Sequence, residues 1–386
     1  MKLALFLAFQ EVWRNRSRFL LFSLVIALIT TLVLFIAALS EGLALANKEY
    51  LEKINAQLLV FQKNVDLSAA VSRLSLSKVN DIGRIEGVSA VGPIGFSNGV
   101  LVFNDGREDL NISLIGVEAG KPGAPPVIAG RSFAIDRGPQ AVIDKNVAER
   151  AGVQIGEQIV IKTIQGTKEE FYRLEVIGLT DERQYLYQPS IFVPYRTWEQ
   201  IRPQMTNGLQ LVETISNVIA VQVDPETDLN IVAERIRAQV KDVDVADIIS
   251  AYKAIPGYQV QQDTLNTQSG FTLLIGILVI GGFFQIQMLQ KVPQIGVLKA
   301  IGVSNFIVAA TVVAQIILVT TFGVGIGTIV SLGLAMGIPS SIPIIFNGNS
   351  MLISVITLLL IGPVGGLVSV RLAVSVEPLI ALGLSS

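Results

Sequence analysis

The chain has 386 residues, of which 51% are hydrophobic and only 16% are charged. This balance is too apolar for an ordinary soluble protein, and a formal net charge of -2 lacks the basic excess that nucleic-acid binding requires. Because the chain has no cysteine and no histidine, disulfide bonds, thiolate nucleophiles, Ser-His-Asp sites and the usual zinc sites are excluded.

Long apolar runs without Asp, Glu, Lys or Arg occur at four places along the chain. A helix needs about 20 such residues to cross the hydrocarbon core of a bilayer, so we predict four transmembrane helices. The predicted order is an amphipathic segment at 1–18, a span at 19–39, an inserted domain at 40–269, a span at 270–289, a short connecting segment at 290–305, a span at 306–336, a loop at 337–350, a span at 351–370 and a tail at 371–386. A secretory signal peptide is the alternative for the first run, but that run is longer than the roughly 7–15 apolar residues of such signals.

The basic residues of the short connecting segments predict the orientation of the spans, because such residues are retained on the cytoplasmic side. They all fall on one side of a four-span bundle: Lys2, Arg14, Arg16, Arg18, Lys291, Lys299 and Arg371. The loop at 337–350 has none. We therefore expect both termini and the segment 290–305 in the cytoplasm, and the inserted domain outside it.

Glycines within the spans indicate close approach between helices. Gly323 and Gly327 form a small-xxx-small pair, which suits close packing within one bundle or, alternatively, a seam between two copies of the chain. In the last span, a cluster predicts a kink or an unwound turn: Gly362, Pro363, Gly365 and Gly366.

The inserted domain reads as an α/β mixture, since short β-branched or alternating runs and turn residues replace the long apolar runs. Predicted strands are 58–62, 99–103, 111–116, 140–143, 158–163, 171–179, 191–194 and 217–223, and predicted helices are 68–85, 145–152, 195–201 and 229–239. No Walker A sequence is present. Gly116 to Lys121 resembles a phosphate-binding loop only superficially, because the glycine spacing is one residue short and Pro122 follows the lysine.

Acidic residues in the inserted domain give no convincing acid–base pair. Glu169 and Glu170 are expected in a turn between strands, and Asp181 and Glu182 follow a strand. Adjacent carboxylates on exposed segments are usually a solvated surface. We therefore predict no catalytic residue in this chain.

The segment 291–306, KVPQIGVLKAIGVSNF, is amphipathic, with apolar residues near helical spacing. One interpretation is a helix lying on the lipid headgroups. The other is a helix that docks into a groove of a separate cytoplasmic protein.

This segment resembles the signature of the FtsX/MacB-type ABC transporter permeases, whose loop reads close to EIGVLKAIGAS. The matching residues are Ile295, Gly296, Val297, Leu298, Lys299, Ala300, Ile301 and Gly302. Residues 141–161 and 191–201 are similar to recurring pieces of that family's periplasmic core domain, and the order of elements agrees over the whole chain. A departure is Gln294, where the family commonly has an acidic residue; Pro293 suits the first turn of a separate helix from about 293 to 303.

The resemblance implies a multi-pass protein of the cytoplasmic membrane that forms a homodimer and binds two copies of a separate ATPase. ATP would be bound by that partner, and no cofactor is expected in this chain. The coupling contacts would come from Lys291 and from Pro293 through Gly302. A periplasmic adaptor of the membrane-fusion type is a further candidate partner.

Within the family, residues 18–44 and 57–63 look most like the HrtB and DevC-type branch, which is associated with haem or toxic-compound efflux and with glycolipid export. The resemblance implies ATP-driven export of an amphiphile by mechanotransmission, with Glu41 as a candidate substrate contact; an interfacial carboxylate that only marks the membrane boundary is the alternative. A signal transducer without transport is the rival function, but its extracytoplasmic domain in FtsX proper is much smaller. A membrane-bound enzyme is disfavoured by the missing His and Cys.

Overall fold

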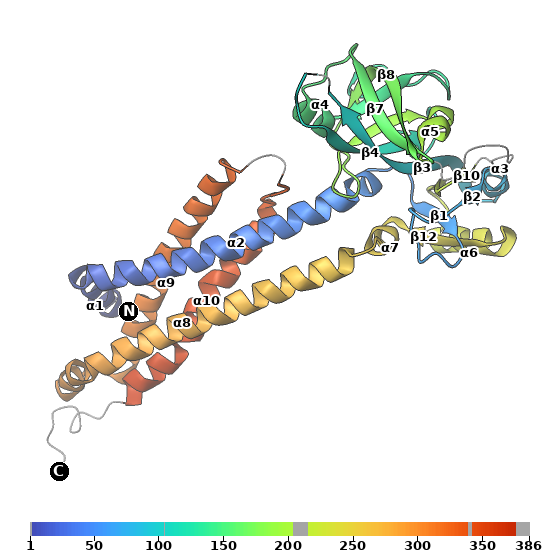
Figure 1. Ribbon diagram of the computed structural model, residues 1–386. Coiled ribbons are helices and arrows are strands. Elements are labelled where there is room, and N and C mark those ends of the chain that lie inside the picture. The colour runs from blue at the N-terminus through green and yellow to red at the C-terminus, as the bar shows by residue number, and fades with distance from the viewer. Residues whose placement is uncertain (1, 104, 204–214, 339–341, 376–386) are drawn as a thin grey trace. The chain divides into compact units, whose positions relative to one another are not determined.

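The computed structural model describes residues 2–103, 105–203, 215–338 and 342–375 (Figure 1). The chain divides into two compact units, a helical unit of Met1–Gly42 with Gln262–Ser386 and an inserted unit of Leu43–Gln261. Both divisions fall inside long helices. The fold class therefore agrees with the prediction of a helical bundle carrying an inserted α/β domain.

Five helices form the helical unit in the described residues: α1 (Lys2–Arg14), α2 (Arg16–Glu52), α8 (Tyr258–Ala300), α9 (Asn305–Ala335) and α10 (Gly348–Ser375). All but α1 are long and apolar enough to cross a membrane. With 37 and 43 residues, α2 and α8 extend to about 55 and 65 Å, well beyond the roughly 30 Å of a hydrocarbon core. These two helices therefore continue past the membrane.

Glycines on α9 bring its backbone against α2. A Cβ atom at Gly323 would lie 2.7 Å from Ile26 Cβ, and one at Gly327 would lie 2.5 Å from the Ala27 carbonyl oxygen. At the same contact, Thr31 Oγ1 donates to the Gly327 carbonyl at 3.2 Å. The predicted small-xxx-small pair thus packs within the bundle, which was one of the two expectations for it.

Helix α10 uses its glycines in the same way. Gly362 and Gly366 face Thr320 and Ile316 of α9, where a Cβ atom would approach side-chain atoms to 2.2 Å in each case. The predicted unwound turn is wrong, because α10 is unbroken through Pro363. A proline removes one hydrogen-bond donor, and close packing on both sides holds the helix together around it.

The inserted unit is built on a ten-stranded mixed sheet with the order β12-β1-β11-β3-β4-β9-β6-β8-β5, in which β7 pairs with β3 and β8. Its strands are β1 (Leu58–Gln62), β3 (Val88–Val102), β4 (Leu110–Val117), β5 (Ala129–Gly130), β6 (Gln140–Asp144), β7 (Gln158–Gln165), β8 (Lys168–Thr180), β9 (Ser190–Pro194), β11 (Val218–Val223) and β12 (Val243–Asp247). A separate pair joins β2 (Leu74–Ser75) and β10 (Ile215–Ser216). Helices α3 (Ser77–Gly83), α4 (Lys145–Ala151), α5 (Tyr195–Ile201), α6 (Leu229–Gln239) and α7 (Ile248–Lys253) complete the unit.

Helix α5 packs on the sheet through Trp198, which is 1% exposed. Gly95 of β3 and Gly116 of β4 are register partners, and a Cβ atom at either would lie within 2.5 Å of the tryptophan. The indole nitrogen donates to Ser97 Oγ at 2.9 Å. Gly116 is therefore a packing residue of the sheet.

The end of α2 is joined to the β8–β9 loop, residues 181–189, by exchanged backbone hydrogen bonds. Tyr187 N–H donates to the Ala46 carbonyl, and Tyr50 N–H donates to the Gln184 carbonyl, both at 3.0 Å. The carboxylate of Glu49 accepts from Gln184 N–H at 3.1 Å. This arrangement, the α2 clasp, fixes the last turns of α2 to the sheet of the inserted unit.

One predicted helix of the inserted unit, 68–85, is wrong over most of its length. Only α3 is helical there, and Ser72 is buried. Ser72 Oγ accepts from Gln62 N–H at 2.9 Å, and Asn217 Nδ2 donates to the Ala69 carbonyl at 2.9 Å. These long-range hydrogen bonds hold the segment in turns, although its local sequence favours a helix.

Candidate functional site

The segment that carries the sequence signature forms the end of α8. Helix α8 is continuous through Pro293 and ends at Ala300, so the predicted separate helix beginning at Pro293 is wrong. The C-terminus of α8 is capped by a Schellman motif, in which Val303 N–H donates to the Leu298 carbonyl and Gly302 N–H donates to the Lys299 carbonyl. Gly302 has φ +99°, a left-handed conformation that glycine adopts without strain.

Side chains of this segment divide into an inward and an outward set. Ile295 and Gly296 are buried against the bundle, and Lys291 and Lys299 are partly buried. The outward set has Pro293, Ala300 and Gly302, together with four residues at the i, i+3, i+4 and i+7 positions of one helix face: Gln294, Val297, Leu298 and Ile301. We call these last four residues the coupling face. Ile301 is 77% exposed and Val297 44%.

Neither lysine of the signature points to solvent. Lys291 Nζ lies 2.5 Å from Glu11 Oε1 of α1 and donates to Gln315 Oε1 of α9 at 3.3 Å. Gln315 Nε2 donates to the other oxygen of Glu11 at 2.5 Å. Lys299 Nζ donates to the Val374 carbonyl, near the end of α10, at 2.6 Å. The two lysines thus tie the end of α8 to α1, α9 and α10.

The polar triad of Glu11, Lys291 and Gln315 includes two residues that sequence reasoning did not select. Gln315 is 2% exposed inside an otherwise apolar helix, and Glu11 is the single acidic residue of the first 40. A buried amide and a lone carboxylate at the edge of a membrane are signals of an internal partner. The contact between Glu11 and Gln315 could not be predicted, because the two residues are 304 positions apart in the sequence.

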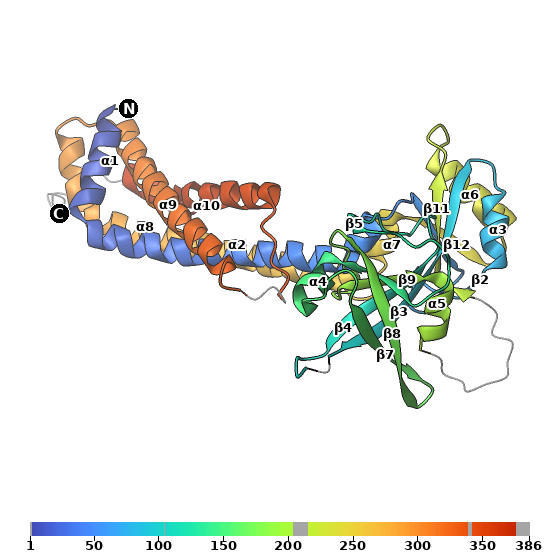
Figure 2. The ribbon, with the colours of Figure 1, turned by 90° about the horizontal axis from the view of Figure 1, so that it is seen from above.

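A groove lies beside the coupling face, between α1, the end of α8 and the start of α9. Its volume is about 490 Å³, within the roughly 300–1,000 Å³ of typical binding pockets. Its lining residues are Leu7, Gln10, Glu11, Arg14, Asn15, Met288, Lys291, Gln294, Ile295, Leu298, Val303, Ile307, Val308, Thr311, Val312 and Gln315. Figure 2 shows α1 bent away from the axis of α2 and lying beside α9.

Glu41, the candidate substrate contact, lies at the other end of the bundle. Its carboxylate accepts from Asn347 Nδ2 at 3.2 Å and from Ser350 Oγ at 3.4 Å, at the start of α10. Nearby, Ile345 N–H donates to the Ala38 carbonyl of α2 at 3.1 Å. Glu41 is therefore bonded to residues at the start of α10, and its contact with a substrate stays a prediction.

The four acidic residues selected from the sequence of the inserted unit lie in two places: two follow β8 and two lie within it. Asp181 and Glu182 form ion pairs with Arg183 at 2.6 Å and Lys145 at 2.9 Å. The hydrogen bond from Lys145 lowers the pKa of Glu182, which favours its ionised form. The predicted turn position of Glu169 and Glu170 is wrong, because both lie in β8 opposite β7.

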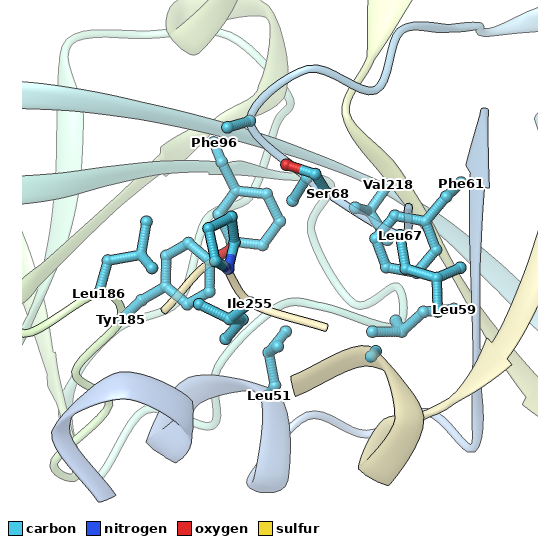
Figure 3. Close-up of a pocket in the computed structure, with 14 residues that line it drawn as sticks. Leu51, Leu59, Phe61, Leu67, Ser68, Phe96, Tyr185, Leu186, Val218 and Ile255 are labelled. Atoms are coloured by element: carbon cyan, nitrogen blue, oxygen red, sulfur yellow. The ribbon is translucent and has the colours of Figure 1, made fainter. Parts of the chain in front are cut away.

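An apolar cavity in the inserted unit lies between the end of α2, the sheet and α7 (Figure 3). Phe96 and Tyr185 line it with rings stacked at 4.5 Å between centroids, and Leu67 and Leu186 are also among its lining residues. Its volume of about 30 Å³ is far below that of a ligand pocket. We regard this cavity as a packing gap of the core.

Comparison with known proteins gives two family matches. Residues 19–239 match the MacB-like periplasmic core domain, and residues 266–378 match the FtsX-like permease C-terminal region. The coupling face and the polar triad residues Lys291 and Gln315 thus lie in the second matched region.

Curated relatives match the chain over nearly its whole length. The HrtB protein of Staphylococcus haemolyticus, whose name assigns it to a hemin transport system as a permease, is 25% identical over 98% of this chain and 99% of its own. An uncharacterized ABC transporter permease of Mycobacterium bovis is 22% identical over 98% of this chain and 99% of its own.

Two solved structures of extracytoplasmic regions are similar to about half of this chain. The periplasmic region of MacB from Actinobacillus actinomycetemcomitans has a TM-score of 0.37 at 16% identity, covering 53% of this chain and 95% of that one. The extracellular domain of the YknZ transporter from Gram-positive bacteria has a TM-score of 0.36 at 16% identity, covering 50% of this chain and 100% of that one.

Proposed function

This chain belongs to the family of ABC transporter permeases that combine a MacB-like periplasmic core domain with an FtsX-like permease region, and from that premise we propose that it exports an amphiphile by mechanotransmission. A separate cytoplasmic ATPase would bind and hydrolyse ATP. Two copies of the permease would bind two copies of that ATPase. The chain itself would hold no cofactor.

The orientation that this function requires follows from the basic residues. Arg14, Arg16 and Lys299 lie at the same end of the helical unit as the coupling face, which the positive-inside rule assigns to the cytoplasm of the cell. The inserted unit would then lie outside the cytoplasmic membrane. A periplasmic adaptor is a further partner that this placement permits.

The coupling face is the observation that carries the proposal. Residues at the i, i+3, i+4 and i+7 positions present one exposed, mostly apolar stripe at the end of α8, as helix-in-groove docking requires. The interfacial-helix alternative would need the whole segment to lie flat on lipid. Helix α8 is instead continuous through the signature, and the other faces of this segment are bonded to α1, α9 and α10.

Mechanotransmission needs stiff elements between a motor and a moving domain. Closure of the ATPases would press on the coupling faces, and the continuous helices α2 and α8 would carry the displacement. The α2 clasp fixes the end of α2 to the sheet of the inserted unit. No ionised residue is needed along a central path, which agrees with the charge-free spans.

Substitution at the coupling face provides the test. Ile301→Asp is expected to reduce ATPase stimulation by the permease about 30-fold, because hot-spot residues contribute on the order of 2 kcal/mol or more to an interface. The measurement is ATP hydrolysis by the reconstituted complex in nanodiscs. Met336→Asp is the matched control, since Met336 is 91% exposed at the opposite end of α9. Equal stimulation in the Ile301→Asp variant and the native chain would refute the coupling face.

Glu41 gives a second test, with hemin as the probe because a relative is named for hemin transport. Glu41→Gln is expected to raise the hemin concentration for half-maximal ATPase stimulation about tenfold, since a hydrogen bond to a charged group contributes roughly 1.5–3 kcal/mol. Ser350→Ala removes only the contact of Glu41 with the first turn of α10 and should change that concentration less than about twofold. If both variants behave alike, Glu41 acts only on the start of α10.

Export and signalling predict different results in liposomes that contain the permease and its ATPase. Export requires that ATP hydrolysis release the loaded amphiphile from the membrane. Hydrolysis that depends on an added extracytoplasmic partner, with no release of hemin, would instead support a signal transducer.

A further inference from the structure

Helix α1 has three chemically distinct faces. Ala8 and Val12 lie on the side that packs in the bundle, and Ala8 is fully buried. Phe6, Phe9 and Trp13 form an exposed aromatic stripe, with exposed fractions of 61–68%. The remaining side lines the groove with Leu7, Gln10, Glu11 and Arg14. At 3.6 residues per turn these faces are separated by roughly a third of the helix circumference.

Each of the first two faces has an environment that satisfies it. The bundle covers one, and the aromatic stripe suits the membrane interface, where tryptophan and phenylalanine are favoured. The third face suits neither environment, because it carries the exposed, polar Gln10 and Arg14. This face opens on the groove and is directed away from the aromatic stripe.

The groove continues into the coupling face. Gln294 and Leu298 belong to the coupling face and also line the groove, opposite the third face of α1. A partner that covers the coupling face would therefore also meet α1. The two walls are held together by the ion pair between Glu11 and Lys291.

The charged residues around the groove indicate the sign of charge expected on the partner segment. Glu11 is bonded to Lys291 and Gln315, so its negative charge is neutralised within the groove. Arg14 is exposed at the rim, and among the described residues it forms no ion pair. The groove therefore presents an unbalanced positive charge beside an apolar wall.

We propose that α1 is the second wall of the ATPase-docking site, and that the groove takes an amphipathic segment of the ATPase with an acidic residue opposite Arg14. This inference rests on the proposed function, in which a cytoplasmic ATPase binds the coupling face. It adds α1 to the coupling machinery and explains why a helix too short to span the membrane is bonded to α8 and α9. A lipid occupying the groove is the competing outcome.

Cysteine accessibility tests the proposal directly, because the chain has no native cysteine. Gln10→Cys, Arg16→Cys and Ile301→Cys are made separately in the full chain, in nanodiscs, and treated with a membrane-impermeant maleimide with and without the ATPase. The expected result is that the ATPase slows labelling of Gln10→Cys and Ile301→Cys about tenfold or more and leaves Arg16→Cys, which is exposed but does not line the groove, unchanged.

The outcomes separate this inference from the proposed function. Protection of Ile301→Cys with unchanged labelling of Gln10→Cys would overturn the role of α1 and leave the coupling face intact. Unchanged labelling of both would refute ATPase docking at this end altogether. A Gln10→Cys variant that is unreactive even without the ATPase would mean that lipid fills the groove, which also overturns the inference.

A charge reversal tests the acidic partner residue. Arg14→Glu is expected to weaken ATPase binding about tenfold, measured as the dissociation constant of the complex in nanodiscs. Arg16→Glu is the matched control, because Arg16 is exposed beside α1 and does not line the groove. Equal weakening by the two reversals would show a general effect of positive charge and contradict a specific contact of Arg14.

Discussion

Replacing Lys291 with methionine is expected to lower the free energy of unfolding of the helical unit by about 3 kcal/mol, near the lower limit for breaking a buried ion pair. The substitution leaves the Glu11 carboxylate and the Gln315 amide without their shared cation. The Glu11 side chain keeps 26% exposure, which moderates the loss through partial hydration. Thermal unfolding of the chain in nanodiscs measures the effect.

The double substitution Glu11→Leu with Lys291→Met should recover most of that loss, because removing both charges leaves no uncompensated group. Arg16→Met, at an exposed basic position, is the control and should change stability little. If Lys291→Met were as stable as Arg16→Met but gave no ATPase stimulation, the structural role of Lys291 would be contradicted. Lys291 would then be a residue that contacts the ATPase.

Introducing valine at Gly327 is expected to destabilise the bundle by about 3 kcal/mol, at the upper end of typical overpacking. The new side chain would meet the Ala27 carbonyl oxygen at 2.5 Å and Thr30 Cβ at 2.6 Å. A backbone oxygen cannot rotate aside, so α2 and α9 must separate. The same substitution at Gly325, which has nothing within 4 Å, is the matched control.

The midpoint of thermal unfolding in nanodiscs compares these two variants. Gly325→Val should remain close to the native chain, while Gly327→Val should unfold at a clearly lower temperature. If both variants lose the same stability, the cost lies in the helix propensity of the glycine positions, and the close contact between α2 and α9 contributes little.

The four membrane helices could be predicted from the sequence because length and hydropathy decide them almost alone. The strand 58–62 and the helices 195–201 and 229–239 were also predicted with the bounds that the structure gives. Failures occurred where long-range contacts override local preference. Asn217 holds the segment around Ala69 in turns, and β12 was missed because its pairing with β1 is not visible in Val243–Asp247.

The signature segment could be located from the sequence, but the roles within it could not. The sequence places both Lys291 and Val297 in one amphipathic segment and does not indicate that their side chains have different partners. The structure turns Lys291 toward Glu11 and leaves Val297 44% exposed. That division depends on helix phase and on residues about 280 positions away along the chain, neither of which a short motif contains.

The α2 clasp explains why the division between the two compact units falls inside an unbroken helix. Ala46 and Tyr50 each direct a backbone group to the β8–β9 loop. If the loop detached, the Ala46 carbonyl and the Tyr50 N–H could bond to each other within the helix, but the Gln184 carbonyl and the Tyr187 N–H would lose these partners, at a cost of about 1–3 kcal/mol for each one still buried. The last turns of α2 and the loop should therefore open and close as one cooperative unit, and this end of a membrane helix gains and loses its order together with the sheet.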